Sequence, residues 1–192
     1  MIPSKARNGN GPDGTGPVPA ERLKVEGEAS LGKTVVKLIA TGLGSGYSPF
    51  APGTAGTLVA IPLYLALSSL SWPLYLASVS VLTLLAVYAA GEAERIFDRK
   101  DSPRIVIDEV VGLLWSLALV APTGWRIAAA FFLFRIFDIL KPQPARWCQD
   151  RLPGGWGVVG DDVMAGLWAN AALQAGLCFF ILLLSIRHPA NH

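Results

Sequence analysis

Five carboxylates interrupt the apolar stretches of this sequence: Asp108, Glu109, Asp138, Asp161 and Asp162. Carboxylate oxygens without a histidine or cysteine beside them form a hard donor set, which suits Mg²⁺ together with water and phosphate oxygens. Asp138 lies inside the apolar run 131–140, where an ionised side chain costs several kcal/mol unless it is paired or functional. Because these acids come from distant parts of the sequence and are expected at one membrane face, they predict a shared magnesium site.

Each acid also has a structural explanation that the sequence leaves open. Asp161 and Asp162 stand where the N-cap of the last apolar segment is expected, and acids there favour the helix dipole. Asp108 and Glu109 are compatible with an acid pair in the first turn of a helix. One Asp is enough for an N-cap, however, so the presence of two consecutive Asp residues at 161 and 162 favours a metal site.

Two cations accompany Asp138. Arg135 and Lys141 stand three residues before and three residues after it, so on a helix both are within reach of its carboxylate. A purely structural Arg–Asp pair is the alternative. Arginine binds a phosphate through two parallel hydrogen bonds, and lysine binds it as a point charge. Together with the acids, the two cations predict metal-assisted chemistry on a phosphate group.

A loop of small and polar residues over 42–57 comes before the first apolar run and includes Ser48. Backbone N–H groups of such a loop, in front of a helix, bind anions. The loop does not match the phosphate-binding pattern Gly-x-x-x-x-Gly-Lys-[Ser/Thr], and similar glycine-rich runs are common in turns. It therefore supports a phosphate site only in combination with the acids.

The composition excludes several classes of protein. Of the 192 residues, 52% are apolar and 16% are charged, against about a quarter charged in soluble domains, so we predict a small membrane protein. A net charge of +2 argues against nucleic-acid binding.

Both histidines, His188 and His192, stand among the last five residues, which argues against histidine-dependent phosphoryl transfer and Ser-His-Asp hydrolysis. Cys148 and Cys178 form no CxxC pair and predict neither a disulfide framework nor a zinc site.

The apolar patterning predicts an all-α fold, a compact multi-helix membrane bundle of about five apolar helices preceded by an amphipathic helix. Residues 1–30 are rich in Gly, Pro and charge and predict a disordered N-terminal tail. Residues 31–41 predict an amphipathic helix at the membrane surface, with an ordinary bundle helix as the alternative. The helical membrane domain covers residues 31–192, with apolar runs at 54–70, 72–91, 105–121, 125–140 and 163–186.

The membrane topology is predicted from the lengths of these runs and from the basic residues between them. Only the second and fifth runs are comfortably long enough to cross about 30 Å of hydrocarbon. Lys and Arg are concentrated before residue 38 and in the segments 92–104 and 141–162, which predicts that these segments are cytoplasmic. If all five runs cross, the C-terminus lies outside and the acids face the cytoplasm.

Four segments resemble motifs of the phosphatidylglycerophosphatase A family: residues 41–57, 107–112, 135–142 and 155–166. They contain the small-residue loop, the Asp108-Glu109 pair, the segment from Arg135 to Lys141, and the Asp161-Asp162 pair, in the order and at the spacings of the family. The resemblance covers about residues 33–186 and leaves out the N-terminal tail.

The resemblance implies a Mg²⁺-dependent phosphatase of the bacterial cytoplasmic (inner) membrane that converts phosphatidylglycerophosphate to phosphatidylglycerol. It implies that the five carboxylates are the metal-binding and catalytic acids, with Arg135 and Lys141 contacting the phosphate. The residues implied to border the headgroup pocket are Ser48, Pro52, Gly53 and Thr54. The implied partners are the lipid substrate and the membrane, with no nucleic acid. Small residues such as Gly112 and Gly166 pack helices within or between chains equally well, so the oligomeric state stays open.

The spacing of the acids does not say which group attacks the phosphate. The chain lacks the Asp-x-Asp-x-[Thr/Val] motif of aspartyl-phosphate enzymes, so we favour a metal-activated water over a phospho-aspartyl intermediate. A lipid phosphotransferase is an alternative function, although its Asp-Gly-x-x-Ala-Arg signature is absent. A small transporter with an intramembrane Arg135–Asp138 pair is another, but it predicts inverted repeats and acids near the middle of spans. A membrane scaffold with structural ion pairs is the remaining alternative.

Overall fold

The computed structural model describes residues 20–187, which form seven α-helices and one short 3₁₀ helix, with no strand among them. In chain order the elements are α1 (Ala20–Ala40), η1 (Ser45–Tyr47), α2 (Pro52–Leu67), α3 (Trp72–Phe97), α4 (Ile107–Ser116), α5 (Gly124–Leu140), α6 (Ala145–Arg151) and α7 (Gly155–Arg187). The prediction of an all-α fold is confirmed.

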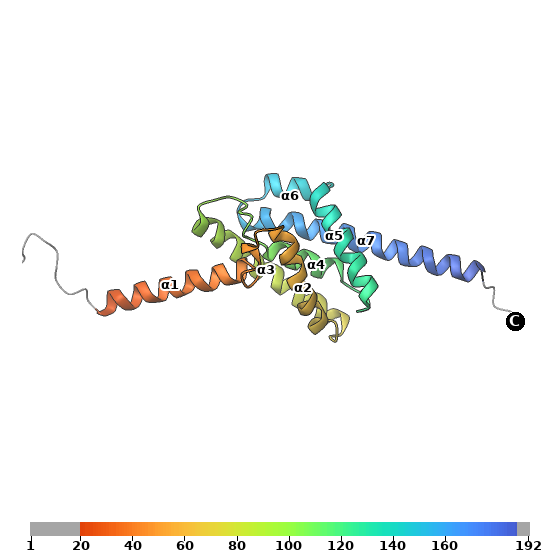
Figure 1. Cartoon of the computed structure of the whole chain (residues 1–192), viewed down its shortest axis with the longest axis horizontal. Coiled ribbons are helices and arrows are strands. Elements are labelled where there is room, and N and C mark those ends of the chain that lie inside the picture. The colour runs from red at the N-terminus through yellow and green to blue at the C-terminus, as the bar shows by residue number, and fades with distance from the viewer. Residues whose placement is uncertain (1–19, 188–192) are drawn as a thin grey trace, which may run out of the picture.

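The short helix α4 lies at the centre of the bundle, with α2, α3, α5 and α7 packed against it (Figure 1). Its side chains Val110, Val111, Leu113 and Leu114 are buried. The helix α1 and the far half of α7 extend away from the bundle in opposite directions (Figure 1). The position of α4 therefore determines which side chains of the surrounding helices meet.

Polar side chains from two neighbouring helices fix the C-terminal end of α4. The last carbonyl groups of a helix have no partner within the helix. Tyr75 of α3 donates a hydrogen bond to the carbonyl of Leu114 over 2.7 Å. Asn170 of α7 donates to the carbonyl of Ser116 over 3.0 Å. These bonds satisfy buried backbone groups and hold α4 against both long helices.

Several helices differ from the predicted ones; among them, α3 extends to Phe97 and α7 begins at Gly155, before the predicted 163. α1 begins at Ala20, so residues 20–30, which we placed in the tail, are helical, while residues 1–19 of that tail lie outside the described residues. The run 105–121 contains only the 10-residue helix α4, because the chain turns near Leu119, whose φ is 61°. The helix α6 was not predicted, since it has only 7 residues and no apolar stripe.

Two of the described helices, α3 and α7, are long and apolar enough to cross a membrane, whereas α2 is apolar but shorter. The predicted count of about five apolar helices is therefore not confirmed. On the far half of α7, side chains such as Phe179 (62% exposed) and Ile181 (61% exposed) are left largely uncovered by the described residues. An exposed apolar surface of this kind supports membrane association of the chain.

Candidate active site

The helices α4 and α7 cross with their backbones in direct contact, because a glycine from each lies at the crossing. A Cβ atom on Gly112 would lie 2.5 Å from the ring of Phe134 and 2.9 Å from the carbonyl oxygen of Asp162. A Cβ atom on Gly166 would collide with the carbonyl oxygen of Gly112. These two glycines therefore pack helices within the chain, and their contact brings the first turn of α4 next to the second turn of α7.

Three carboxylates meet at this crossing and are called the acid cluster below: Asp108, Glu109 and Asp162. One oxygen from each lies within 4.8 Å of the other two. Oxygens on opposite sides of one Mg²⁺ are about 4.2 Å apart, given bonds of about 2.1 Å. The cluster therefore needs only small side-chain movements to surround an ion of this size.

The acid cluster also has unused hydrogen-bonding capacity. Asp108 and Asp162 are only 7% and 4% exposed. One oxygen of each, with one of Glu109, is buried without a hydrogen-bond partner among the described residues. Buried polar atoms are nearly always paired, so three such oxygens in one place fit a cation as their missing partner.

The environment of Asp108 disfavours its negative charge. Burial raises the pKa of this carboxyl well above its ordinary value, and the neighbouring carboxylates of Glu109 and Asp162 raise it further. Burial likewise raises the pKa of Glu109. Since these neighbours repel one another, a bound cation would relieve the repulsion and favour the ionised acids.

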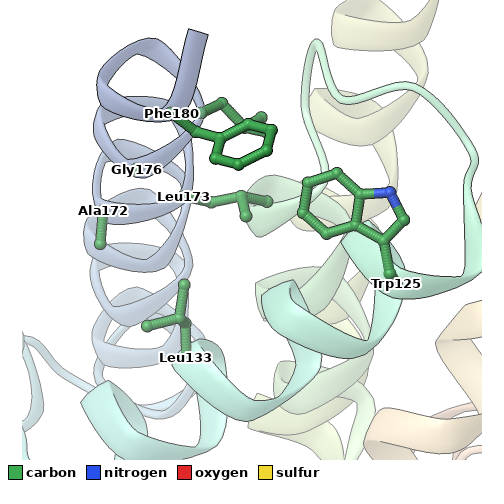
Figure 2. A pocket seen from close by; sticks show the side chains of 7 residues that line it. Trp125, Leu133, Ala172, Leu173, Gly176 and Phe180 are labelled. Carbon is green, nitrogen blue, oxygen red and sulfur yellow. The ribbon is translucent and has the colours of Figure 1, made fainter. Parts of the chain in front are cut away.

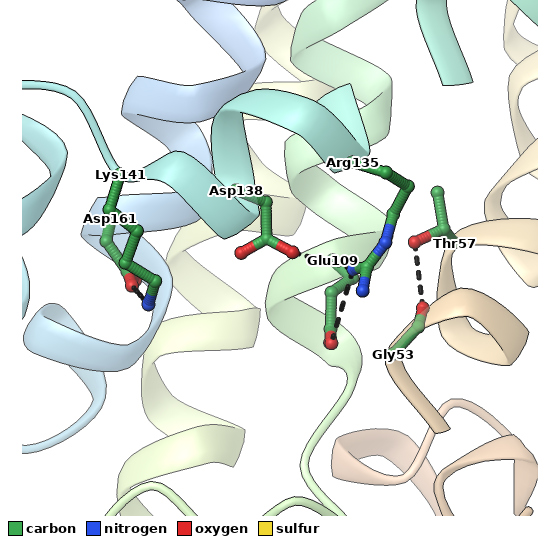
Figure 3. A network of polar contacts seen from close by, with 7 residues as sticks. All are labelled: Gly53, Thr57, Glu109, Arg135, Asp138, Lys141 and Asp161. Carbon is green, nitrogen blue, oxygen red and sulfur yellow. Dashed lines mark hydrogen bonds and ion pairs between the residues drawn. The ribbon is translucent and has the colours of Figure 1, made fainter. Parts of the chain in front are cut away.

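The other two acids each hold a cation (Figure 3). Arg135 donates from Nη1 to Asp138 Oδ2 over 2.7 Å, and the same nitrogen lies 4.0 Å from Glu109 Oε1. Lys141 Nζ donates to Asp161 Oδ2 over 2.5 Å. The Arg135 and Lys141 side chains are 20% and 25% exposed. Two partly accessible cations therefore lie beside the buried acid cluster, where an anionic ligand can reach them.

The partner of Lys141 differs from the prediction. Helix α5 ends at Leu140, and Lys141 caps it in the left-handed conformation with φ 46°. This turn takes Lys141 off the helical face that carries Asp138, so its ammonium group bonds to Asp161 of α7 instead. The i+3 spacing held for Arg135, which lies within the helix, but it failed for Lys141.

The N-cap explanation of Asp161 and Asp162 is wrong. Helix α7 begins at Gly155, so both acids lie in its second turn and cannot cap it. Asp108 and Glu109 do lie in the first turn of α4. The dipole explanation therefore remains available for this pair, although it leaves their unpartnered oxygens unexplained.

One glycine of the small-residue loop, Gly53, lies next to the side chains of Glu109 and Arg135. A Cβ atom on Gly53, in the first turn of α2, would collide with Glu109 Oε1 and lie 3.2 Å from Arg135 Nη1. Ser48 lies further back in the loop and donates to the carbonyl of Phe50. The two remaining loop residues of the prediction, Pro52 and Thr54, are half-buried in the first turn of α2.

Thr57 is a buried polar residue next to this site that the sequence analysis included only as the last residue of the small-residue loop. Its hydroxyl donates to the carbonyl of Gly53 over 2.8 Å and fixes the first turn of α2 (Figure 3). A threonine that bonds to the carbonyl four residues earlier is common in helices. Its spacing from Gly53 is therefore the sequence signal for this hydrogen bond.

A helical bundle that combines a carboxylate cluster, two partly accessible cations and a glycine in close contact with them has the groups needed for phosphate-ester chemistry. Comparison with known sequences identifies the family. The profile of the family named Phosphatidylglycerophosphatase A matches residues 38–177. The chain therefore belongs to the phosphatidylglycerophosphatase A family and is a phosphatase.

Three relatives cover most of the chain. The phosphatidylglycerophosphatase A of Escherichia coli is 38% identical over 146 residues, which are 75% of this chain and 81% of that protein. The Haemophilus influenzae protein of the same name is 39% identical over 136 residues, 70% of this chain and 83% of its own length. A Bacteroides thetaiotaomicron protein, provisionally named a phosphatidylinositol-3-phosphatase, is 43% identical over 142 residues, 69% of this chain and 87% of its own. No solved structure matches the chain.

Proposed function

We propose that this chain hydrolyses the terminal phosphate monoester of phosphatidylglycerophosphate to phosphatidylglycerol and inorganic phosphate, with Mg²⁺ bound by the acid cluster. Two of the relatives carry the name of this activity. The third is named for a phosphoinositide, which has a different headgroup, but both substrates are phosphate monoesters on a membrane lipid. The observation that carries the proposal is three unpartnered buried carboxylate oxygens next to two partly exposed cations.

The residues of the site have different roles in the proposed reaction. Asp108, Glu109 and Asp162 would hold Mg²⁺, which when bound polarises the phosphoryl group and favours attack by water. Arg135 and Lys141 bind the phosphoryl oxygens and offset the charge that they gain in the transition state. The attacking water passes a proton to a carboxylate of the site, and the departing headgroup oxygen takes one up. The water oxygen thereby joins the phosphorus as the ester bond breaks.

We also propose that the site faces the cytoplasm. The segments 92–104 and 141–162, which are rich in Lys and Arg, adjoin the acids in the chain, and basic loops are retained on the cytoplasmic side. A cysteine-labelling experiment on intact cells tests this orientation. A cysteine placed at Lys100, which is exposed in the loop after α3, should react only after the membrane is permeabilised, in a background without the two native cysteines.

Phosphate release from mixed micelles tests the activity. The purified chain should release phosphate from phosphatidylglycerophosphate with Mg²⁺ present and stop when a chelator is added in excess. Phosphatidylinositol 3-phosphate in the same micelles serves as the competing substrate. A higher kcat/KM for the phosphoinositide would overturn the assigned headgroup and keep the reaction. Release that persists in chelator would overturn the role of the metal.

A further inference from the structure

An apolar groove runs between α5 and α7 (Figure 2), and no acidic residue lines it. Its volume is about 600 Å³, within the range of about 300–1,000 Å³ that small-molecule sites occupy. It is lined by apolar side chains and a glycine, and the residues that matter here are Trp125, Leu133, Ala172, Leu173, Gly176 and Phe180.

The groove has two aromatic walls and an open centre. Trp125 and Phe180 are 57% and 58% exposed, and Leu173, at 5% exposed, lies between them (Figure 2). A Cβ atom on Gly176 would meet nothing within 4 Å. No other described residue fills the space above Gly176, and a flexible apolar chain can lie there without moving the helices.

The two helices that line the groove, α5 and α7, also carry part of the site, including Arg135 and Asp162, which fixes their relative depth. Leu133 stands two residues before Arg135. At 1.5 Å per helical residue, Ala172 is about 15 Å beyond Asp162 and Phe180 is about 27 Å beyond it. One leaflet of the hydrocarbon core is about 15 Å thick. The near end of the groove is therefore at about the depth that the far ends of the acyl chains reach, if the lipid phosphate lies at the acids.

We propose that this groove binds one acyl chain of the phospholipid substrate while Arg135 and Lys141 hold its phosphate. The inference rests on the proposed function. An acyl chain fits the observations better than a helix of a second copy, because a helix is about 10–12 Å across and would meet the two protruding aromatic rings rather than fill the space between them. The groove would align the lipid so that its phosphate arrives at the site from the membrane side.

Filling the groove should affect long-chain lipids selectively. The full chain carrying Gly176→Leu is compared with wild type on dipalmitoyl and dihexanoyl phosphatidylglycerophosphate in the same detergent. We expect an increase in KM of about tenfold for the dipalmitoyl substrate with kcat retained, and no change for the dihexanoyl substrate, whose chains are too short to reach Gly176. Ala175→Leu is the matched control, because Ala175 is exposed on the same helix and does not line the groove.

Each other outcome contradicts a specific part of the proposal. Equal loss on both substrates, or loss on neither, would overturn the acyl-chain groove. A change in oligomeric state of Gly176→Leu at unchanged chain-length dependence would assign the groove to a second copy. If Gly176→Leu does not fold, Trp125→Ala removes one wall and should raise KM for the dipalmitoyl substrate in the same selective way. Wild-type protein that is inactive on both substrates would instead refute the proposed function.

Discussion

The carboxylates of the candidate site lie in two regions that differ in what surrounds them. At the crossing of α4 and α7, Asp108 and Asp162 are buried and form no ion pair with any described residue. Beside the end of α5, Asp138 and Asp161 each hold a cation. Within the acid cluster only Glu109 faces a cation, Arg135 at 4.0 Å, so the first region has excess negative charge and can accept an added cation. The second keeps two cations oriented and ready for an added anion.

The two regions also differ in how they are held. Backbone contact between Gly112 and Gly166 fixes the acid cluster, and close-packed helices leave little room for adjustment. The ion pairs depend on a side chain near the end of α5 and on Lys141, which stands just past that end. We expect changes at the crossing to abolish metal binding and changes at the ion pairs to weaken substrate binding.

The largest effect is expected from Asp162→Asn. Loss of a ligand charge should lower kcat/KM by about 10³-fold and abolish binding of Mn²⁺, used as a spectroscopic substitute for Mg²⁺. The melting temperature should stay the same or rise, because a buried carboxylate without a partner destabilises the fold. Asp150→Asn, at an exposed position on α6, is the control. Near-normal turnover in Asp162→Asn would remove this residue from the site.

A smaller but still large effect is expected from Gly166→Ala. The new methyl group would collide with the carbonyl oxygen of Gly112 and push α7 away from α4. Overpacking of this kind costs about 1–3 kcal/mol of stability, and we expect a loss of activity of about 10²-fold as the acid cluster opens. The matched change Gly32→Ala, on α1, meets open space and should reduce neither stability nor activity. If the two variants behave alike, the crossing does not set the geometry of the cluster.

The ion pairs should respond differently. Lys141→Gln is expected to raise KM by about 10–100-fold, the equivalent of one charge-assisted hydrogen bond to phosphate, while Mn²⁺ binding stays at the wild-type level. Arg146→Gln removes an exposed charge from the neighbouring helix α6 and serves as the control. Loss of Mn²⁺ affinity in Lys141→Gln would show that the two regions do not act separately.

The sequence predicted the composition of the site better than its geometry. Local rules were enough for the all-α fold and for the Arg135–Asp138 pair, because both depend on helical spacing. They failed for Lys141, whose partner depends on where α5 ends and on how α7 packs beside it. Gly112 and Gly166 were visible as small residues, but a sequence does not say which glycines face each other. Contacts between distant helices set that arrangement.

The smallest effect is expected from deletion of residues 1–19. Every carboxylate and cation of the site lies between Asp108 and Lys141 or in the first turns of α7, and the family profile matches only from residue 38 onward. We expect kcat, KM and Mn²⁺ affinity all within about twofold of wild type, as for changes remote from a site. Because KM reports on the ion pairs and Mn²⁺ affinity reports on the acid cluster, any departure from this expectation can be assigned to one of the two regions. A rise in KM alone would connect this segment to the ion pairs and substrate entry, whereas a loss of Mn²⁺ affinity would connect it to the acid cluster.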